Sequence, residues 1–249
     1  MSKSFQSDTE LVRLSGAAAH CLGEQTAEPV RVPTRGRHVP RWKRGLDLAC
    51  IVVSAPILLP LGSLIALAIK LLSRGPVLFR QERIGLFGEP FTCLKFRTML
   101  VNADTSVHQG HLNRLMTSNA PMTKLDAAGD PRLIPGGLWL RSLGLDELPQ
   151  VINVLRGEMS LVGPRPCVPY EYEHYLPRHR HRCATLPGLT GYWQVNGKNR
   201  TTFEQMMDMD LYYVKRKSLI LDLWIIAMTI PTLLGQFYDV RIRRRRFEV

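Results

Sequence analysis

Cysteine and acidic side chains are both scarce in this sequence of 249 residues. Its five cysteines are an odd number and include no Cys-x-x-Cys pair, which excludes a disulfide framework and favours a reducing compartment. Only 21 residues are Asp or Glu, against 33 that are Lys or Arg, so the net charge is +12. This shortage of acidic residues predicts an anionic partner: a nucleic acid, an acidic lipid or a phosphorylated substrate.

The sequence also lacks the zinc motifs and recognition helices that many nucleic-acid-binding proteins use. One group of metal-ligand residue types, His179, His181 and Cys183, alternates with arginines. Because these cations would repel a metal ion, we interpret the segment as a solvated basic loop, which is still able to face a phosphate. A basic membrane-tethered protein that binds nucleic acid or serves as an adaptor is an alternative of another class.

The first 40 residues lack a sustained hydrophobic period and are rich in Ser, Thr, Gly, Pro and charged residues. This composition predicts a disordered leader over residues 1–40. Its apolar patches are short and no cleavage site follows them, which excludes a secretory signal.

A long apolar run follows the leader. From Leu46 to Leu72 the only charged residues are Asp47 and Lys70, with 22 uncharged residues between them. At about 1.5 Å per residue, a helix of this length is able to cross a bilayer core. Pro56 and Pro60 lie inside the run, and Pro60 in particular removes a helix hydrogen bond near its centre.

Both flanks of the run are basic, whereas a spanning helix has its excess of Lys and Arg at one end. A reentrant segment over residues 41–75 would enter, bend at Pro60 and return to the same face, which satisfies both the prolines and the charges. A single spanning helix with tolerated prolines is the alternative. The flanking cations are Arg35, Arg37, Arg41, Lys43 and Arg44 before the run, and Lys70, Arg74, Arg80 and Arg83 after it.

The most informative string is residues 141–166, in the part of the chain that follows. We predict a short helix here with Asp146 at its N-cap, Pro149 in its first turn and Gly157 at its end. Asp146 and Glu147 then lie at the positive end of the helix dipole, which favours their ionised forms and a bound phosphate. A pair of this kind is most often a solvated cap, so its neighbours decide its role. The apolar face of this helix is Leu145, Leu148, Val151, Ile152 and Leu155.

Several cations are candidates for binding phosphate or contacting this carboxylate pair. Arg165 is held between Pro164 and Pro166, so it loses little entropy when it meets a phosphate. We expect Val77-Leu78-Phe79 and Phe91-Thr92-Cys93-Leu94 to form a hairpin of short strands around the turn Gly85-Leu86-Phe87-Gly88. Lys95 and Arg97 then lie on the same side of an extended segment, with Phe96 opposite. Arg141 completes the set. For each of these cations, a solvated or salt-bridged surface position is the simpler alternative.

The whole pattern predicts a mixed α/β protein that is mainly helical: a reentrant helix-break-helix in the membrane, joined to a small catalytic domain with surface amphipathic helices. We expect a leader at 1–40, a membrane segment at 41–75, a catalytic domain at 76–238 and a basic tail at 239–249. The apolar helix over residues 219–234 suits an interfacial role. Five arginines within residues 241–246 suit contact with anionic lipids, or a solvated tail.

From Trp42 to about Gln236 the chain resembles the bacterial sugar transferase family, the small monotopic phosphoglycosyl transferases that prime polysaccharide assembly. Motifs occur in the family's order over nearly the whole of this range. They are Lys43-Arg44-x-x-Asp47, Gln81-Glu82-Arg83-Ile84-Gly85, Lys95-Phe96-Arg97-Thr98-Met99, Leu145-Asp146-Glu147-Leu148-Pro149-Gln150, Asn153-Val154-Leu155-Arg156-Gly157-Glu158-Met159-Ser160, Val162-Gly163-Pro164-Arg165-Pro166, Pro187-Gly188-Leu189-Thr190-Gly191 and Tyr212-Tyr213-Val214. Two positions depart from the family: Leu59 stands where many members have Ser before the proline, and Lys198 replaces an arginine.

The resemblance implies transfer of a sugar 1-phosphate from a UDP-sugar to undecaprenyl phosphate, with release of UMP. It makes Asp146 the nucleophile that forms a phosphosugar-aspartyl intermediate, Glu147 its partner carboxylate, and Mg²⁺ the cofactor that the two bind. It also places Pro60 at the bend of the reentrant helix and the catalytic domain on the cytoplasmic face of the bacterial inner membrane. Such an enzyme would catalyse the first membrane step of exopolysaccharide or capsule synthesis.

Within this class, similarity to exopolysaccharide-priming members, including Tyr192-Trp193-Gln194, favours glucose or galactose as the sugar. The same reaction with an N-acetylated UDP-sugar is the alternative. The implied partners are the UDP-sugar, undecaprenyl phosphate, anionic membrane lipids and downstream glycosyltransferases, with self-association into a homo-oligomer also considered and no nucleic acid.

Overall fold

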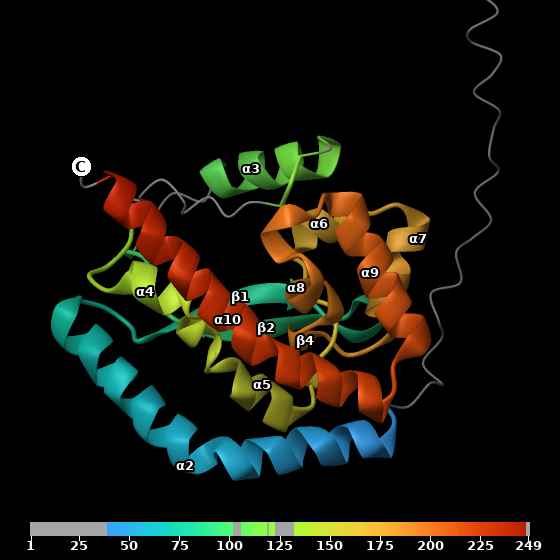
Figure 1. Ribbon diagram of the computed structural model, residues 1–249, viewed down its shortest axis with the longest axis horizontal. Helices are drawn as coiled ribbons and strands as arrows, with labels where there is room; N and C mark the ends of the chain where they lie inside the picture. The colour runs from blue at the N-terminus through green and yellow to red at the C-terminus, as the bar shows by residue number, and fades with distance from the viewer. Residues whose placement is uncertain (1–38, 102–105, 119, 123–131, 248–249) are drawn as a thin grey trace, which may run out of the picture. The chain divides into compact units, whose positions relative to one another are not determined.

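The computed structural model of the protein describes residues 39–101, 106–118, 120–122 and 132–247 (Figure 1). The predicted leader, residues 1–40, lies almost entirely outside these ranges. The described residues are mainly helical, with two small two-stranded sheets. The predicted class, mixed α/β with helix predominant, is therefore confirmed.

The apolar run forms one long helix, α2, over Arg41–Leu72. We expected a break in the helix, but its helical backbone continues through Pro56 and Pro60, and the helix bends in its middle instead (Figure 1). Each proline removes a single N–H, so the rest of the hydrogen-bond ladder can persist around the bend. Ser63 lies one turn beyond Leu59 and donates its hydroxyl to the Leu59 carbonyl at 2.9 Å.

The two halves of α2 pack on the same compact unit. In the first half, Asp47 accepts hydrogen bonds from the Ser160 hydroxyl at 3.0 Å and the Leu161 backbone N–H at 2.9 Å. In the second half, Ile65 and Ile69 are buried in an apolar cluster that includes Phe96. The helix is therefore held near both of its ends.

The remaining surface of α2 is apolar and exposed. Among the described residues, α2 is the one helix that is long and apolar enough to cross a membrane by length and composition. Its exposed large apolar side chains are Leu48, Val52, Val53, Ile57, Leu59, Leu64, Leu67, Leu71 and Leu72. Water solvates such a surface poorly, so we expect this face of α2 to lie in an apolar environment.

Two hairpin strands, β1 (Leu78–Ile84) and β2 (Pro90–Phe96), pair antiparallel with Gln81 opposite Cys93. A tight turn, η1 (Leu86–Gly88), joins them, as the glycines of this segment predicted. A second sheet consists of the short parallel strands β3 (Ser160–Val162) and β4 (Gly188–Thr190). The charged side chains of the site described below belong in part to these strands and to the loops that follow them.

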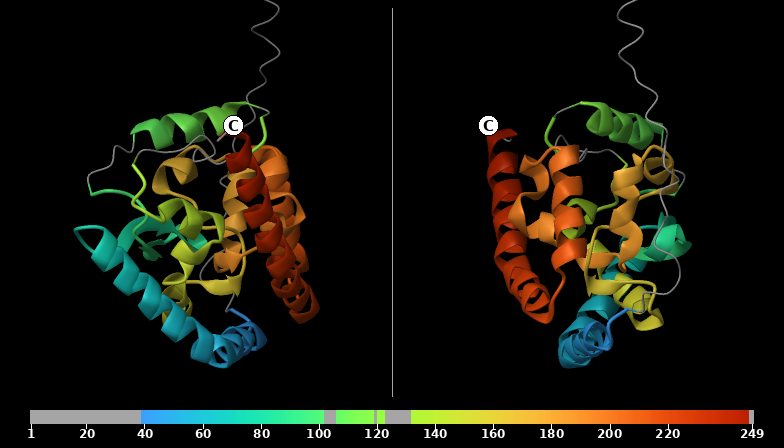
Figure 2. Two further views of the ribbon diagram at one scale, coloured as in Figure 1. Left: turned by 60° about the vertical axis from the view of Figure 1, so that its left-hand side comes forward. Right: turned by 90° about the vertical axis from the view of Figure 1, so that its right-hand side faces the viewer.

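Short helices connect these strands, and a long helix ends the described chain. Figure 2 shows α2 and α10 on different sides of the unit, with the sheets and the short helices between them. The helix predicted over 219–234 continues as α10 through Phe247. The remaining elements are α3 (Ser106–Thr117), α4 (Gly137–Ser142), η3 (Leu145–Glu147), α5 (Gln150–Arg156), α6 (Pro169–Glu173), α7 (Pro177–Arg180), η4 (His181–Ala184), α8 (Tyr192–Asn196), η5 (Lys198–Arg200), α9 (Phe203–Arg216) and α10 (Leu219–Phe247).

A buried ion pair fastens the start of α2 to the start of α10. Lys43 and Asp222 are both fully buried, and Lys43 Nζ lies 2.6 Å from Asp222 Oδ2. Lys43 also donates to the Tyr213 hydroxyl at 2.9 Å and to the Val162 carbonyl at 2.8 Å. Burial, and then the charge of Asp222, raise the pKa of Tyr213, so its hydroxyl stays protonated and donates to Asp222 Oδ1 at 2.8 Å.

Removing one member of this pair should destabilise the fold strongly. We expect Asp222→Asn to lower the free energy of unfolding by about 3–5 kcal/mol, because it leaves the Lys43 ammonium buried without a counter-charge. The double change Lys43→Met with Asp222→Leu should recover most of the loss. Denaturant unfolding in detergent measures both. Asp208→Asn is the matched control, since the Arg178–Asp208 pair is exposed and worth at most about 1 kcal/mol. An Asp222→Asn protein as stable as this control would contradict the prediction.

Candidate active site

The carboxylate pair lies in a tight turn rather than at a helix N-cap. Asp146 and Glu147 belong to η3, where Glu147 N–H donates to the Gly144 carbonyl at 3.1 Å. The helix that we predicted to start at Asp146 begins only at Gln150, with Pro149 as its N-cap. That prediction was wrong because the segment before Gln150 forms a 3₁₀ turn rather than the first turn of an α-helix, with Leu148 N–H donating to the Leu145 carbonyl at 3.3 Å. The predicted end is confirmed, since Gly157 caps α5 with a left-handed backbone at φ 80°.

Glu147 faces two of the predicted cations. Arg165 donates from Nη2 to Glu147 Oε1 at 2.8 Å and from Nη1 to Oε2 at 3.4 Å. Lys95 Nζ lies 3.6 Å from the same Oε1. The side chains are 36% exposed for Arg165, 19% for Glu147 and 14% for Lys95, so the group is partly screened from water but still open to a ligand. Arg165 and Lys95, two of the cations that the sequence analysis considered for this role, therefore contact the carboxylate pair through Glu147.

Two backbone–backbone hydrogen bonds and two bonds from arginine side chains to backbone carbonyls fix the loop that carries Arg165. Gly163 N–H donates to the Thr190 carbonyl and Gly188 N–H to the Pro164 carbonyl, each at 2.9 Å. Arg182 donates to the Arg165 carbonyl and Arg83 to the Pro166 carbonyl, also at 2.9 Å. Pro164 and Pro166 limit the backbone further. The guanidinium of Arg165 thus projects from a rigid support, as the prolines predicted.

Close backbone contact between β3 and β4 explains the glycines around this loop. A Cβ on Gly163 would lie 2.3 Å from the Leu186 carbonyl oxygen, and one on Gly191 would lie 2.3 Å from the Gly163 carbonyl oxygen. A Cβ on Gly188 would lie 2.1 Å from the Gly163 nitrogen. No larger residue fits at these three positions without moving the backbone. The glycines therefore allow the Arg165 loop and β4 to pack this closely.

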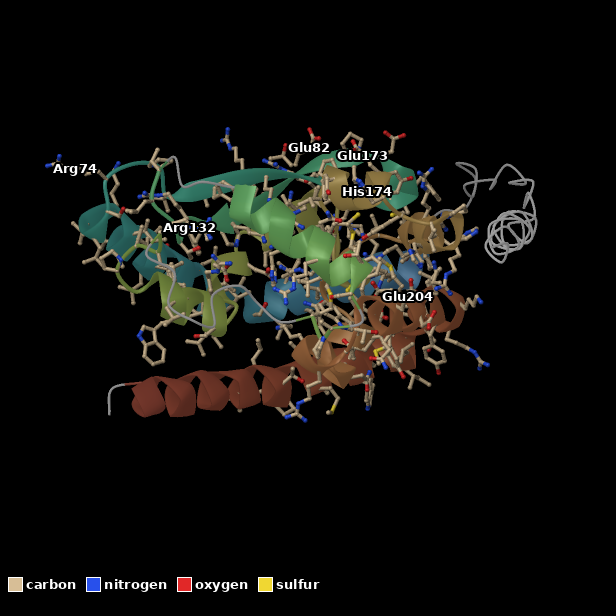
Figure 3. All side chains as sticks on the ribbon, turned by 90° about the horizontal axis from the view of Figure 1, so that it is seen from above. Arg74, Glu82, Arg132, Glu173, His174 and Glu204 are labelled. Carbon is tan, nitrogen blue, oxygen red and sulfur yellow. The ribbon has the colours of Figure 1, made fainter. Side chains whose placement is uncertain are left out.

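Sequence reasoning missed two arginines that complete the site. Arg83 lies on β1 beside Gln81, to whose side-chain oxygen it donates from Nη2 at 2.7 Å, and the charges of Arg165 and Glu147 both act on its pKa. Glu82, between them, is exposed and points outward (Figure 3). Strand alternation after the hairpin signal would have placed Arg83 on the face of Lys95.

Arg182, the other missed arginine, is buried at the back of the loop. It pairs with Asp210 at 2.5 Å and donates to the Tyr175 hydroxyl at 2.6 Å. We predicted a solvated basic loop for this stretch. At Arg182 that prediction was wrong, because this side chain is buried against its partners and supports the fold. Nothing local in the sequence indicates this pairing, because Asp210 lies 28 residues away.

The electrostatics of the site follow from crowding several cations around one carboxylate. Burial, and then the neighbouring arginines, lower the pKa of Lys95 against the opposing effect of Glu147. Burial and the charge of Arg165 likewise lower the pKa of Arg83. The pKa of Arg165 is raised, chiefly by Glu147 and against its own burial. An added anion would relieve the repulsion among these cations.

The other predicted site residues lie in different settings. Arg97 is buried and donates to the carbonyls of Pro76 at 2.6 Å and Ser73 at 3.1 Å, so its guanidinium holds the connection between α2 and β1. Arg141 is half-buried at the end of α4, and its carbonyl accepts from Gly144 N–H at 3.4 Å, directly before the carboxylate pair. Asp146 is half-buried, and its charge acts on Arg165.

The chemistry of the carboxylate pair fits a hard cation only in part. Among the described residues there is no group of three or more His, Cys, Asp or Glu side chains able to hold a metal ion. Mg²⁺ needs few protein ligands, because it keeps waters and binds substrate phosphates. Glu147 already engages Arg165 through both oxygens, so metal binding there would compete with this pair. Asp146 is the better ligand of the two.

Comparison with known proteins places this site in a defined class. A sequence profile described as bacterial sugar transferase matches residues 38–236, which include α2, both sheets and the carboxylate pair. The chain therefore belongs to the bacterial sugar transferase family and is a transferase.

Three curated relatives illustrate the similarity. The exopolysaccharide production protein ExoY of Sinorhizobium fredii is 38% identical over 189 residues, covering 76% of this chain and 84% of the relative. A UDP-glucose:undecaprenyl-phosphate glucose-1-phosphate transferase of Caulobacter vibrioides is 40% identical over 200 residues, covering 77% and 69%. An undecaprenyl-phosphate galactose phosphotransferase of Salmonella typhimurium is 35% identical over 199 residues, covering 77% of this chain and 40% of the relative.

The close contacts of Gly163 make a stability prediction. A methyl group there would lie 2.3 Å from the Leu186 oxygen and 2.8 Å from the Gly188 nitrogen, so we expect Gly163→Ala to cost about 1–3 kcal/mol or more. Gly110→Ala in α3 is the matched control: its Cβ meets nothing within 4 Å, and it should be neutral or stabilising by up to about 1 kcal/mol. Denaturant unfolding compares the two. Equal stability of both variants would refute the steric argument.

Proposed function

We propose that the protein transfers a sugar 1-phosphate from a UDP-sugar to undecaprenyl phosphate and releases UMP. The observation that carries this proposal is Glu147 held against Arg165 and Lys95, with Asp146 next to it. Such a site offers cations for a diphosphate and a carboxylate that can act as a nucleophile. Relatives named for this transfer with glucose or galactose support it.

In the first step, a carboxylate oxygen of Asp146 attacks the sugar-linked phosphorus of the UDP-sugar. The bond from that phosphorus to the UMP oxygen breaks, and UMP leaves with its electron pair. Phosphoryl transfer depends mainly on positioning and on neutralising the phosphate charge. Arg165, on its rigid loop, and Lys95 are the groups nearest Glu147 that can supply this charge.

In the second step, a phosphate oxygen of undecaprenyl phosphate attacks the phosphorus of the aspartyl ester. The bond to the Asp146 oxygen breaks, which regenerates the carboxylate and gives the lipid diphosphate sugar. A covalent nucleophile divides the displacement in this way and gives ping-pong kinetics. Lys95 and Arg165 would again face the reacting phosphate.

Mg²⁺ is the cofactor that fits such a substrate. When bound, it would neutralise charge on the diphosphate oxygens, with Asp146 as its first protein ligand and Glu147 as the second. Two residues of this chain would have the other roles. Asp146 would supply the nucleophilic oxygen, and Glu147 would keep Arg165 and Lys95 oriented towards the reacting phosphate.

We also propose that α2 is reentrant and that the catalytic domain lies on the cytoplasmic face of the inner membrane. Packing of both halves of α2 on one compact unit supports this, since a domain on one side of a bilayer could not hold both ends of a spanning helix. The bend (Figure 1) and the basic flanks agree with it. The exposed apolar side chains of α2 would then face the acyl chains.

The sugar is proposed to be glucose or galactose, with an N-acetylated UDP-sugar as the alternative. Two relatives that are named for transfer of glucose 1-phosphate and of galactose phosphate support the hexoses. The exopolysaccharide role of ExoY supports a place at the start of polysaccharide synthesis.

The decisive experiment is UMP release from a panel of UDP-sugars with undecaprenyl phosphate and Mg²⁺. We expect release with UDP-glucose or UDP-galactose, and a fall of at least about 10⁴-fold in Asp146→Asn, because loss of a covalent nucleophile commonly costs this much. Asp208→Asn, a change at an exposed aspartate on α9, should keep full activity. Mass spectrometry after incubation with the UDP-sugar alone should find the phosphosugar on Asp146.

Three results would count against this mechanism. They are full activity in Asp146→Asn, a phosphosugar attached to another residue, and no UMP release from any UDP-sugar.

The reentrant topology predicts that both ends of α2 lie on one side of the membrane. We expect Arg41→Cys and Arg74→Cys, both at exposed positions, to react with an impermeant maleimide in inverted vesicles and not in intact spheroplasts. The protein without these added cysteines is the control for background labelling. Labelling of the two positions from opposite sides would mean a spanning helix.

A further inference from the structure

Asn153, in the middle of α5, is fully buried and makes an unusually complete set of hydrogen bonds. Its Oδ1 accepts from Leu94 N–H at 3.0 Å. Its Nδ2 donates to the Thr92 carbonyl at 2.7 Å and to Glu158 Oε2 at 2.6 Å. Both amide donors and the amide oxygen are thus used inside the protein.

These partners leave only one orientation for the amide. If oxygen and nitrogen exchanged places, the amide nitrogen would face the Leu94 donor, and the amide oxygen would face the Thr92 carbonyl and the Glu158 carboxylate. Each of these contacts would then be repulsive. The side chain is therefore fixed in direction as well as in place.

The bonds to Thr92 and Leu94 fall on β2, whose other side pairs with β1. A strand at the edge of a sheet has unpaired N–H and C=O groups that need partners. The amide of Asn153 offers one acceptor and one donor to this edge, as the backbone of a neighbouring strand would. Asn153 thereby attaches α5 to β2 without a third strand.

The attachment joins the two segments that form the site. α5 follows the carboxylate pair without a break, because Val151 N–H donates to the Leu148 carbonyl at 3.0 Å and Ile152 N–H to the Pro149 carbonyl at 3.0 Å. Lys95 comes directly after Leu94 on β2. The separation between Glu147 and Lys95, 3.6 Å, thus lies between segments that Asn153 holds together.

We propose that Asn153 is a positioning residue, whose amide sets the register between the Asp146-Glu147 turn and the strand that carries Lys95. It touches no reacting atom and acts through these two segments. The proposal rests on the proposed transferase function for its effect on turnover, whereas its effect on Lys95 is independent of any substrate.

The test is Asn153→Asp, which keeps the shape and the acceptor but loses both donors and adds repulsion with Glu158. We expect kcat for UMP release to fall about 100-fold with little change in the KM for the UDP-sugar, because a misplacement of about 1 Å costs this much. Adding Glu158→Gln restores a donor to the new carboxylate. This double variant should recover about tenfold of kcat, the equivalent of one buried hydrogen bond.

A second readout needs no activity: the yield of the amide bond that a carbodiimide forms between the Lys95 amine and the Glu147 carboxylate, measured by peptide mass spectrometry. This reagent joins an amine and a carboxylate that lie in contact, as these two do at 3.6 Å, so the yield should fall in Asn153→Asp, where the two move apart. Asn196→Asp is the matched control, since Asn196 is exposed and donates only to the Tyr192 carbonyl among the described contacts.

An unchanged yield of the cross-link between Lys95 and Glu147 in Asn153→Asp overturns the proposal, whatever the activity does. So does a kcat that falls only in proportion to the folded fraction. If wild type releases no UMP from any UDP-sugar, the transferase function fails alone, and the cross-link yield still decides the role of Asn153.

Discussion

A single buried cation, Lys43, joins the parts on which the rest of the structure depends. Its ammonium bonds the Val162 carbonyl, the Tyr213 hydroxyl and Asp222. Val162 ends β3, and the Gly-Pro-Arg-Pro loop with Arg165 starts at the next residue. An ammonium buried without such partners would cost several kcal/mol, so the starts of α2 and α10 and the base of the Arg165 loop have to assemble together.

The same logic governs the site itself. Arg165 and Lys95 both face the Glu147 carboxylate, so their side chains are ordered and would lose little freedom on binding the phosphate of the proposed substrate. The hydrogen bonds of Asn153, the close backbone contacts of the glycines at β3 and β4, and the buried pair of Arg182 and Asp210 hold the backbone behind these charges. The charged groups of the site therefore rest on a backbone that many buried contacts keep in place.

Local pattern was enough to predict the apolar helix, the hairpin, and the meeting of the carboxylate pair with Arg165. Each of these rests on a short string whose chemistry is self-contained. The N-cap assigned to Asp146 failed because the carboxylate pair lies in a 3₁₀ turn, whose residue types resemble those of the first turn of an α-helix. Asn153 and Arg182 could not be assigned their roles, since the backbone groups that they bind lie between 17 and 61 residues away. Arg97 was predicted to bind phosphate, yet its guanidinium is taken up by two carbonyls at the end of α2.

That last contact has a mechanical meaning. Only residues 73–77 separate α2 from β1, and Arg97 holds the carbonyls of both Ser73 and Pro76. Helix α2 and the unit that carries Asp146 are thus joined by a stiff connection rather than a flexible one. If α2 lies in one leaflet, as we propose, the height of Asp146 above the lipid headgroups is fixed by the fold. A lipid-borne phosphate would then meet Asp146 at one height, set by the protein and not by the diffusion of a tethered domain.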